Sequence, residues 1–144
     1  MASSVMRSTL PHPFGPFWRG VASDVPATGA WLLRGGLILG CGAAIGVAAW
    51  AGDPIGFLLA DPALARLLRG MALIKAVIAL AAVGIVFMRL AWPVSRTAAA
   101  GYLAGCWALA GSSALIWQLS YIVPAALLFH AAALSLLLVG WRER

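Results

Sequence analysis

The sequence is poor in charged residues, and this shortage sets its class. Only 10% of its 144 residues are charged, whereas 63% are hydrophobic. A soluble domain carries about 25% charged residues, so the composition excludes an ordinary soluble protein. The chain has four carboxylates, and all lie outside its long apolar runs: Asp24, Asp53, Asp61 and Glu143. The intramembrane acid of a proton-coupled carrier is missing, which counts against that function.

Clusters of reactive or metal-binding side chains are also missing. Cys41 and Cys106 lie in separate apolar runs, with no CxxC motif and no Cys/His cluster, so neither a disulfide framework nor a metal site is expected. The sequence has no carboxylate pair, no nucleophile beside a base and no glycine loop of the kind that binds phosphate before a helix. We therefore expect a protein that is not an enzyme.

The net charge is +6, but it does not indicate a nucleic-acid partner. The basic residues flank apolar runs, where they meet lipid headgroups, and no basic run of the kind that follows phosphates is present. Residues 1–27 contain no apolar stretch followed by a cleavage site, so no secretory signal peptide is expected. The expected partners are lipid and other membrane-protein subunits.

Long apolar runs bounded by aromatic residues are the main positive feature. The run from Tyr121 to Trp141 covers twenty residue steps, which make about 30 Å of helix, the thickness of a hydrocarbon core. Prolines and short polar turns separate it from similar runs. The sequence therefore predicts an all-α integral membrane protein, a bundle of four transmembrane helices with spans at about 28–51, 71–91, 98–118 and 121–141.

Shorter segments surround these spans. We expect residues 1–27 to form a cytoplasmic or interfacial tail, residues 54–70 to form an amphipathic segment before the second span, and residues 142–144 to form a basic end. Asp61 and Pro62 are typical of a helix start, with Asp as the N-cap and Pro at the first helical position.

Arginine counts predict the orientation. With four spans, one side carries seven arginines, namely Arg7, Arg19, Arg34, Arg89, Arg96, Arg142 and Arg144. The other side carries only Arg66, Arg69 and Lys75, and Lys75 is expected to reach outward to the headgroups. Positive charge favours the cytoplasmic side, so both termini are expected there. The arginine-, alanine- and glycine-rich composition is typical of a GC-rich bacterial genome, which indicates the bacterial inner membrane.

Glycines at helical spacing indicate surfaces for helix docking. Two small-xxx-small patterns overlap in the first span, Gly36/Gly40 and Gly42/Gly46, and the third span has Gly101 and Gly105 on one face. Such glycines let helix backbones approach closely, which gains contacts where lipid offers no hydrophobic drive.

His130 is the candidate functional residue, because it lies near the middle of the fourth span. One interpretation is a packing histidine whose imidazole bonds to Ser112 or Ser113 of the preceding span. Another is a b haem ligand or a quinone contact, with small neighbours that leave room for a flat ring. The second haem ligand would then come from another subunit.

Trp107 and Ser112 lie on the span that faces His130 and are candidates to line such a cofactor. Trp107 is near mid-depth although tryptophan prefers interfaces, so it is buried against a helix or cofactor ring, or is a plain lipid-facing or core aromatic.

The sequence as a whole predicts a non-catalytic small subunit or assembly partner of a larger bacterial inner-membrane complex, with a respiratory or photosynthetic redox complex as the natural host. No cofactor is expected for such a subunit. The first alternative is a redox subunit that binds b haem or quinone at His130. The second is a homo-oligomeric channel or carrier for a small solute.

Overall fold

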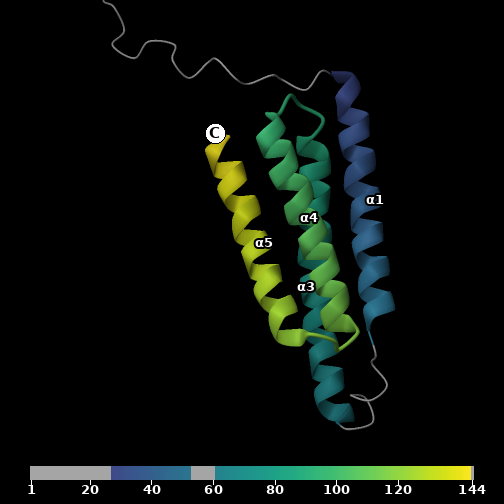
Figure 1. The fold of residues 1–144 in the computed structure, drawn as a ribbon. Coiled ribbons are helices and arrows are strands. Elements are labelled where there is room, and N and C mark those ends of the chain that lie inside the picture. The colour runs from purple at the N-terminus through teal and green to yellow at the C-terminus, as the bar shows by residue number, and fades with distance from the viewer. Residues whose placement is uncertain (1–26, 53–60, 144) are drawn as a thin grey trace, which may run out of the picture.

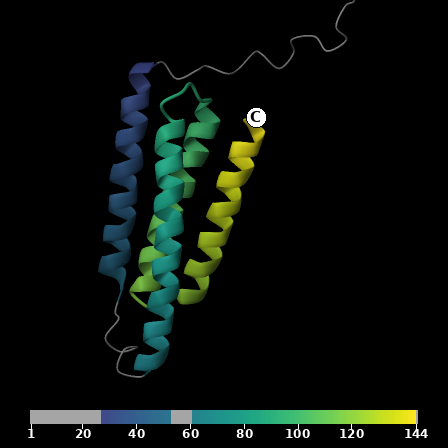
Figure 2. The same cartoon turned by 180° about the vertical axis from the view of Figure 1, so that it is seen from behind.

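A computed structural model describes residues 27–52 and 61–143 and builds them from helices alone (Figure 1). The helices are α1 (Ala27–Ala51), α3 (Pro62–Arg89), α4 (Arg96–Trp117) and α5 (Ile122–Arg142). All four are long and apolar enough to cross a membrane, and successive helices run in opposite directions (Figures 1 and 2). The prediction of an all-helical protein with four candidate membrane spans is confirmed. The tail up to residue 26, residues 54–60 of the amphipathic segment and residue 144 lie outside the described residues.

Polar side chains cap the starts of two helices. Asp61 precedes α3, and its carboxylate accepts a hydrogen bond from the Leu64 amide at 3.0 Å, with Pro62 in the first turn. This confirms the predicted helix start. Ser95 caps α4 in the same way, since its hydroxyl accepts from the Ala98 amide at 3.2 Å. Each cap satisfies an amide that the first turn of a helix leaves without a partner.

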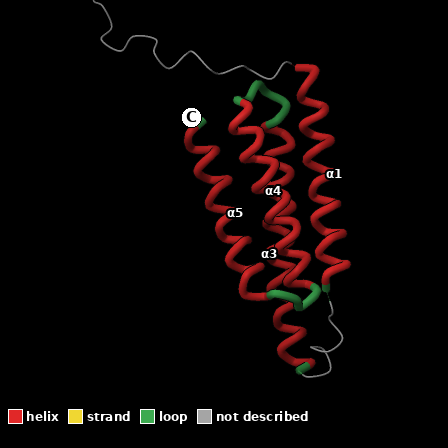
Figure 3. The backbone as a smooth tube through the Cα atoms, viewed as in Figure 1, coloured by secondary structure: helices red, strands yellow, loops and turns green. Residues whose placement is uncertain are grey.

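The turn between α4 and α5 occupies only residues 118–121 (Figure 3). Leu119 and Tyr121 adopt positive φ angles of 58° and 51° to reverse the chain in so few residues. Side chains with a Cβ rarely adopt this left-handed conformation, which costs roughly 1 kcal/mol or more at each position. The short turn holds α4 and α5 as antiparallel neighbours.

Helix α4 is the centre of the bundle. Helices α1, α3 and α5 each pack along it, whereas α1 meets α3 only briefly and α3 makes no close backbone contact with α5. Half of the apolar window of α4 is buried, against 17% in α3 and in α5 and 11% in α1. The three outer helices therefore present most of their surface to the surroundings.

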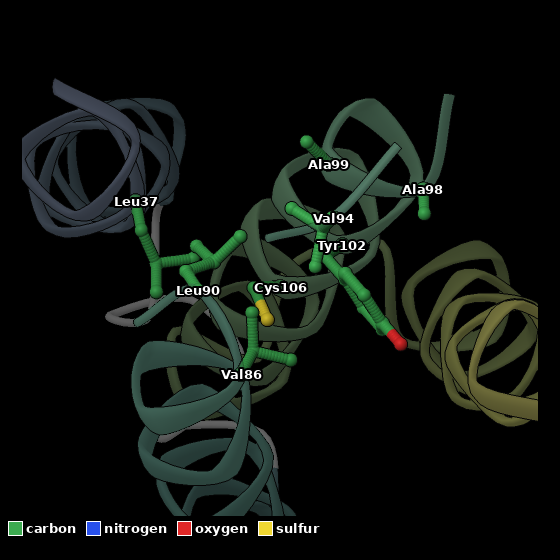
Figure 4. Packing of buried hydrophobic residues seen from close by; sticks show 8 residues of the cluster. All are labelled: Leu37, Val86, Leu90, Val94, Ala98, Ala99, Tyr102 and Cys106. Atoms are coloured by element: carbon green, nitrogen blue, oxygen red, sulfur yellow. The ribbon is translucent and has the colours of Figure 1, made fainter. Parts of the chain in front are cut away.

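Buried residues form three clusters along α4. Figure 4 shows the cluster nearest the α3–α4 turn, in which Leu37, Leu90 and Val86 surround Cys106. The middle cluster joins Ala79, Leu109, Phe129 and Ala132, and the cluster nearest the α4–α5 turn joins Ala72, Ile116 and Ala125. The last two clusters set the register of the outer helices, because they place Ala72 to Ala79 of α3 at the depth of Ala125 to Ala132 of α5.

Candidate functional site

Three of the six candidate docking glycines are used inside the chain. A Cβ added at Gly40 would meet the Trp107 indole. A Cβ at Gly101 would lie 2.9 Å from Val139, and one at Gly105 would lie 2.6 Å from Leu136. These separations are below van der Waals contact, so glycine is needed for α1 and α5 to approach α4 this closely.

The other candidate glycines stay open. Beyond the backbone of α1 itself, no atom of the described residues lies within 4 Å of a Cβ added at Gly36, Gly42 or Gly46, and the same holds for Gly35. Gly35, Gly42 and Gly46 fall about 140 to 180° around α1 from the buried Leu37, at about 100° per residue. We call these three residues the outer glycine stripe. The predicted pair Gly36/Gly40 is thus divided, with Gly36 open and Gly40 packed against Trp107, whereas Gly42/Gly46 stays together on the outer face.

Trp107 lies between α1 and α5 rather than in the core. Its side chain is 38% exposed and packs on Gly40. It lines a groove of about 550 Å³ along α4, together with Ser112 and, from α5, Leu128. The groove is almost wholly apolar, and the Ser112 hydroxyl is already bonded, which leaves few polar groups to orient a ligand.

The structure does not bring His130 and the serines of α4 together. Ser112 and Ser113 are buried and donate to the Leu109 carbonyl at 3.1 and 2.8 Å. His130 is exposed, because it lies about 100° around α5 from Phe129, which packs on α4. Local bonds of serine to its own helix are common and remove the need for a histidine partner.

Within the described residues, only one ring nitrogen of His130 is hydrogen-bonded. Its Nδ1 lies 2.7 Å from the Ala126 carbonyl. A carbonyl oxygen can only accept, so Nδ1 is the donor, and a neutral ring with this bond has its unshared pair on Nε2. Histidines that bind metals commonly have this arrangement, in which the second nitrogen donates to a backbone carbonyl.

The surroundings of Lys75 differ from those that the sequence predicts. It lies near the middle of α3, and its Nζ is 4.2 Å from the centroid of the Phe129 ring. Phe129 is 4% exposed, so the ammonium points into the bundle at mid-helix rather than outward to the headgroups as expected. The position of Lys75 thirteen residues after the predicted helix start at Pro62 could have revealed this depth.

A polar network joins three helices near the α3–α4 turn. The Tyr102 hydroxyl donates to the Glu143 carboxylate at 2.8 Å, and Arg89 forms an ion pair with the same oxygen at 3.1 Å. Figure 4 shows Tyr102 reaching from α4 toward α5. Nearby, Arg34 of α1 donates to the Phe87 carbonyl at 3.1 Å, which satisfies a carbonyl at the end of α3.

A second groove, of about 800 Å³, runs between α3 and α5. We call it the α3–α5 groove. Arg89, Tyr102 and Glu143 line its end near the α3–α4 turn. The walls are apolar: Ile78, Ala82 and Ile85 from α3, and Ala133, Leu137 and Gly140 from α5. The groove exists because both helices pack on α4 without close backbone contact with each other.

The helices define the class, a multi-pass membrane protein. No family model matches the chain, and no match is found among the curated proteins or the solved structures. Within residues 27–52 and 61–143, no three His, Cys, Asp or Glu side chains gather as a metal site would require. The candidate functional features are therefore the outer glycine stripe, His130, Lys75 and the α3–α5 groove.

Proposed function

We propose that this protein is a non-catalytic subunit that assembles with, and stabilises, a larger complex of the bacterial inner membrane, with both termini in the cytoplasm. The observation that carries the proposal is the outer glycine stripe. Gly42 and Gly46 are exposed, and no side chain of the described residues covers them. Helix α1 packs on α4 through its opposite face, so this surface is free for another helix.

The energetics favour a partner at the stripe. A glycine in a helix interior is less favourable than alanine by about 1 kcal/mol, so the three glycines together cost about 3 kcal/mol. Gly40 offsets this cost by close packing on Trp107, but the stripe gains no such contact within the chain. Close approach of a partner helix would supply the missing dispersion contacts, because small residues let backbones meet.

Purification from native membranes tests this proposal. The tagged chain, solubilised in mild detergent, is expected to bring a larger membrane protein with it. Replacement of Gly42 and Gly46 by leucine should remove that protein, since the new side chains hold the two backbones apart. Gly84→Leu is the matched control, because Gly84 is an exposed glycine of α3 with no atom near its Cβ. A chain that purifies alone, or a partner that survives the Gly42 and Gly46 changes, would refute the proposal.

A second candidate function is a redox subunit that shares a b haem with its partner through His130. The position of His130 at mid-helix favours it, because the side chain is exposed and Nδ1 is the nitrogen that bonds to its own helix, which would leave Nε2 to bind a ligand. His130 would supply one nitrogen ligand to the haem iron, and the partner would supply the other. The test is the absorption spectrum of the native complex. A haem band that is lost in His130→Ala supports this function, and a band unchanged by that replacement, or no band, excludes it.

A further inference from the structure

Lys75 holds a positive charge at a depth where charge is costly. It lies fourteen residues before Arg89, about 21 Å along α3. Phe129 is seven residues into α5, so the ammonium that contacts its ring lies about 10 Å from the end of the bundle that holds the α4–α5 turn. A lysine inside the hydrocarbon core costs up to roughly 3 kcal/mol, the figure for a span centre. A cation over an aromatic ring gains about 0.5 to 2 kcal/mol depending on its exposure, and Lys75 is only partly buried, so the ring offsets part of this cost.

No acidic side chain of the described residues lies at the depth of Lys75. The two described acids are Asp61 and Glu143. Asp61 caps the start of α3, and Glu143 follows the end of α5, where it pairs with Arg89. These positions are at opposite ends of the bundle. The charge of Lys75 is therefore complemented only by a group from outside these residues.

Lys75 does not itself line the α3–α5 groove, but it lies one turn before the groove on the same face of α3. Ile78 and Ala82 follow Lys75 by three and seven residues, which places them on its face of the helix, and both line the groove. On the opposite wall, Ala133 and Gly140 are small, so a third helix can approach the groove closely.

We propose that the α3–α5 groove binds a transmembrane helix of the partner that carries an aspartate or glutamate at the depth of Lys75. This inference rests on the proposed function and names the chemistry of the partner at a second surface. Depth decides the source of the negative charge. A lipid phosphate stays in a headgroup region, and the nearer one, at the α4–α5 end, is about 10 Å from the ammonium, whereas a side chain of a helix can place a carboxylate beside Lys75. Lys75 is partly buried against the Phe129 ring in the free chain, so pairing removes less water from the lysine than it would from a fully exposed one.

Photo-crosslinking in living cells tests the groove directly. A photoreactive amino acid is introduced at Ile78, which is 48% exposed in the groove, and in a parallel strain at Leu39, which is 76% exposed on the outer side of α1. The expected product at Ile78 is a transmembrane segment of the partner with an Asp or Glu within about one turn of the crosslink. A crosslink only to lipid, to a second copy of this chain, or to a segment without a carboxylate overturns the inference.

Charge variants separate pairing from folding. Lys75→Met keeps the apolar stem but removes the charge, so the isolated chain should be at least as stable as the wild type. The same change should lower the crosslink yield at Ile78 about tenfold, equivalent to about 1.4 kcal/mol. Lys75→Glu should also lose the crosslink, and changing the partner's acid to lysine should restore it. An unchanged yield in Lys75→Met, or no rescue, overturns the inference. If the wild type still crosslinks to a partner protein from Leu39, the proposed function stands although the groove inference fails. If the wild type crosslinks to no partner protein from either Ile78 or Leu39, both the proposed function and the groove inference are refuted.

Discussion

Replacing Gly105 with alanine is expected to destabilise the protein, whereas the same replacement at Gly42 is not. The Cβ that Gly105→Ala introduces would lie 2.6 and 2.7 Å from Cδ2 and Cγ of Leu136, so the branch point of a partly buried leucine would have to move. A Cβ at position 42 meets no atom of the other described helices within 4 Å. The two changes are chemically identical and differ only in what surrounds them.

The magnitude follows from two terms. Both replacements gain about 1 kcal/mol of helix propensity, so this term cancels when the two variants are compared. Overpacking at Gly105 costs roughly 1 to 3 kcal/mol. Gly105→Ala should therefore be less stable than Gly42→Ala by about 1 to 3 kcal/mol, which corresponds to a factor of about 5 to 150 in the equilibrium for opening.

Thiol labelling measures this difference in the isolated chain. Cys106 is 0% exposed and lies beside Gly105, so a maleimide reaches it only when the bundle opens. In a Cys41→Ala background Cys106 is the single cysteine. Labelling of Gly105→Ala in detergent should be about 5 to 150 times faster than labelling of Gly42→Ala. Equal rates, or faster labelling of Gly42→Ala, would refute the assignment of Gly105 to the core and of Gly42 to open surface.

The same labelling assay measures the stability changes expected for three further replacements. Arg34→Gln removes the hydrogen bond to the Phe87 carbonyl and should cost about 1 to 2 kcal/mol; an unchanged rate would contradict a role in holding α1 to α3. Tyr102→Phe removes the bond to Glu143 and should cost a similar amount, about 1 to 2 kcal/mol, while labelling as slow as in the parent would show that this bond contributes nothing. His130→Ala should change stability by less than about 0.5 kcal/mol, because the ring is exposed and its bond is local; a large loss would restore the packing interpretation.

The class of fold was predictable because hydropathy and helix breakers act locally. Each span is long enough to cross a membrane, and the Asp61 cap depends only on residues within one turn. The backbone of a membrane span must satisfy its own hydrogen bonds, which leaves the helix as the structure for such runs. Four helices therefore follow from the order of residues alone.

The contacts of the candidate site were less predictable, because they depend on how far each helix is rotated. Gly36 and Gly40 form a sequence pattern, yet the rotation of α1 buries Gly40 against Trp107 and leaves Gly36 open. The rotation of α5 points Phe129 inward and His130 outward, so the histidine does not meet Ser112. The sequence predicts an interfacial Lys75 because the predicted span begins at residue 71, nine residues after the helix itself begins at Pro62.

The central claim is that this chain assembles with a different membrane protein. The size and composition of the assembly in native membranes test this claim most directly. Native electrophoresis of mildly solubilised membranes is expected to show the 14.9 kDa chain in a larger particle that contains a different polypeptide. Gly42→Leu should release the chain from this particle, and Gly84→Leu should leave it in place. A chain that migrates alone, or a particle built only from copies of this chain, would contradict the account.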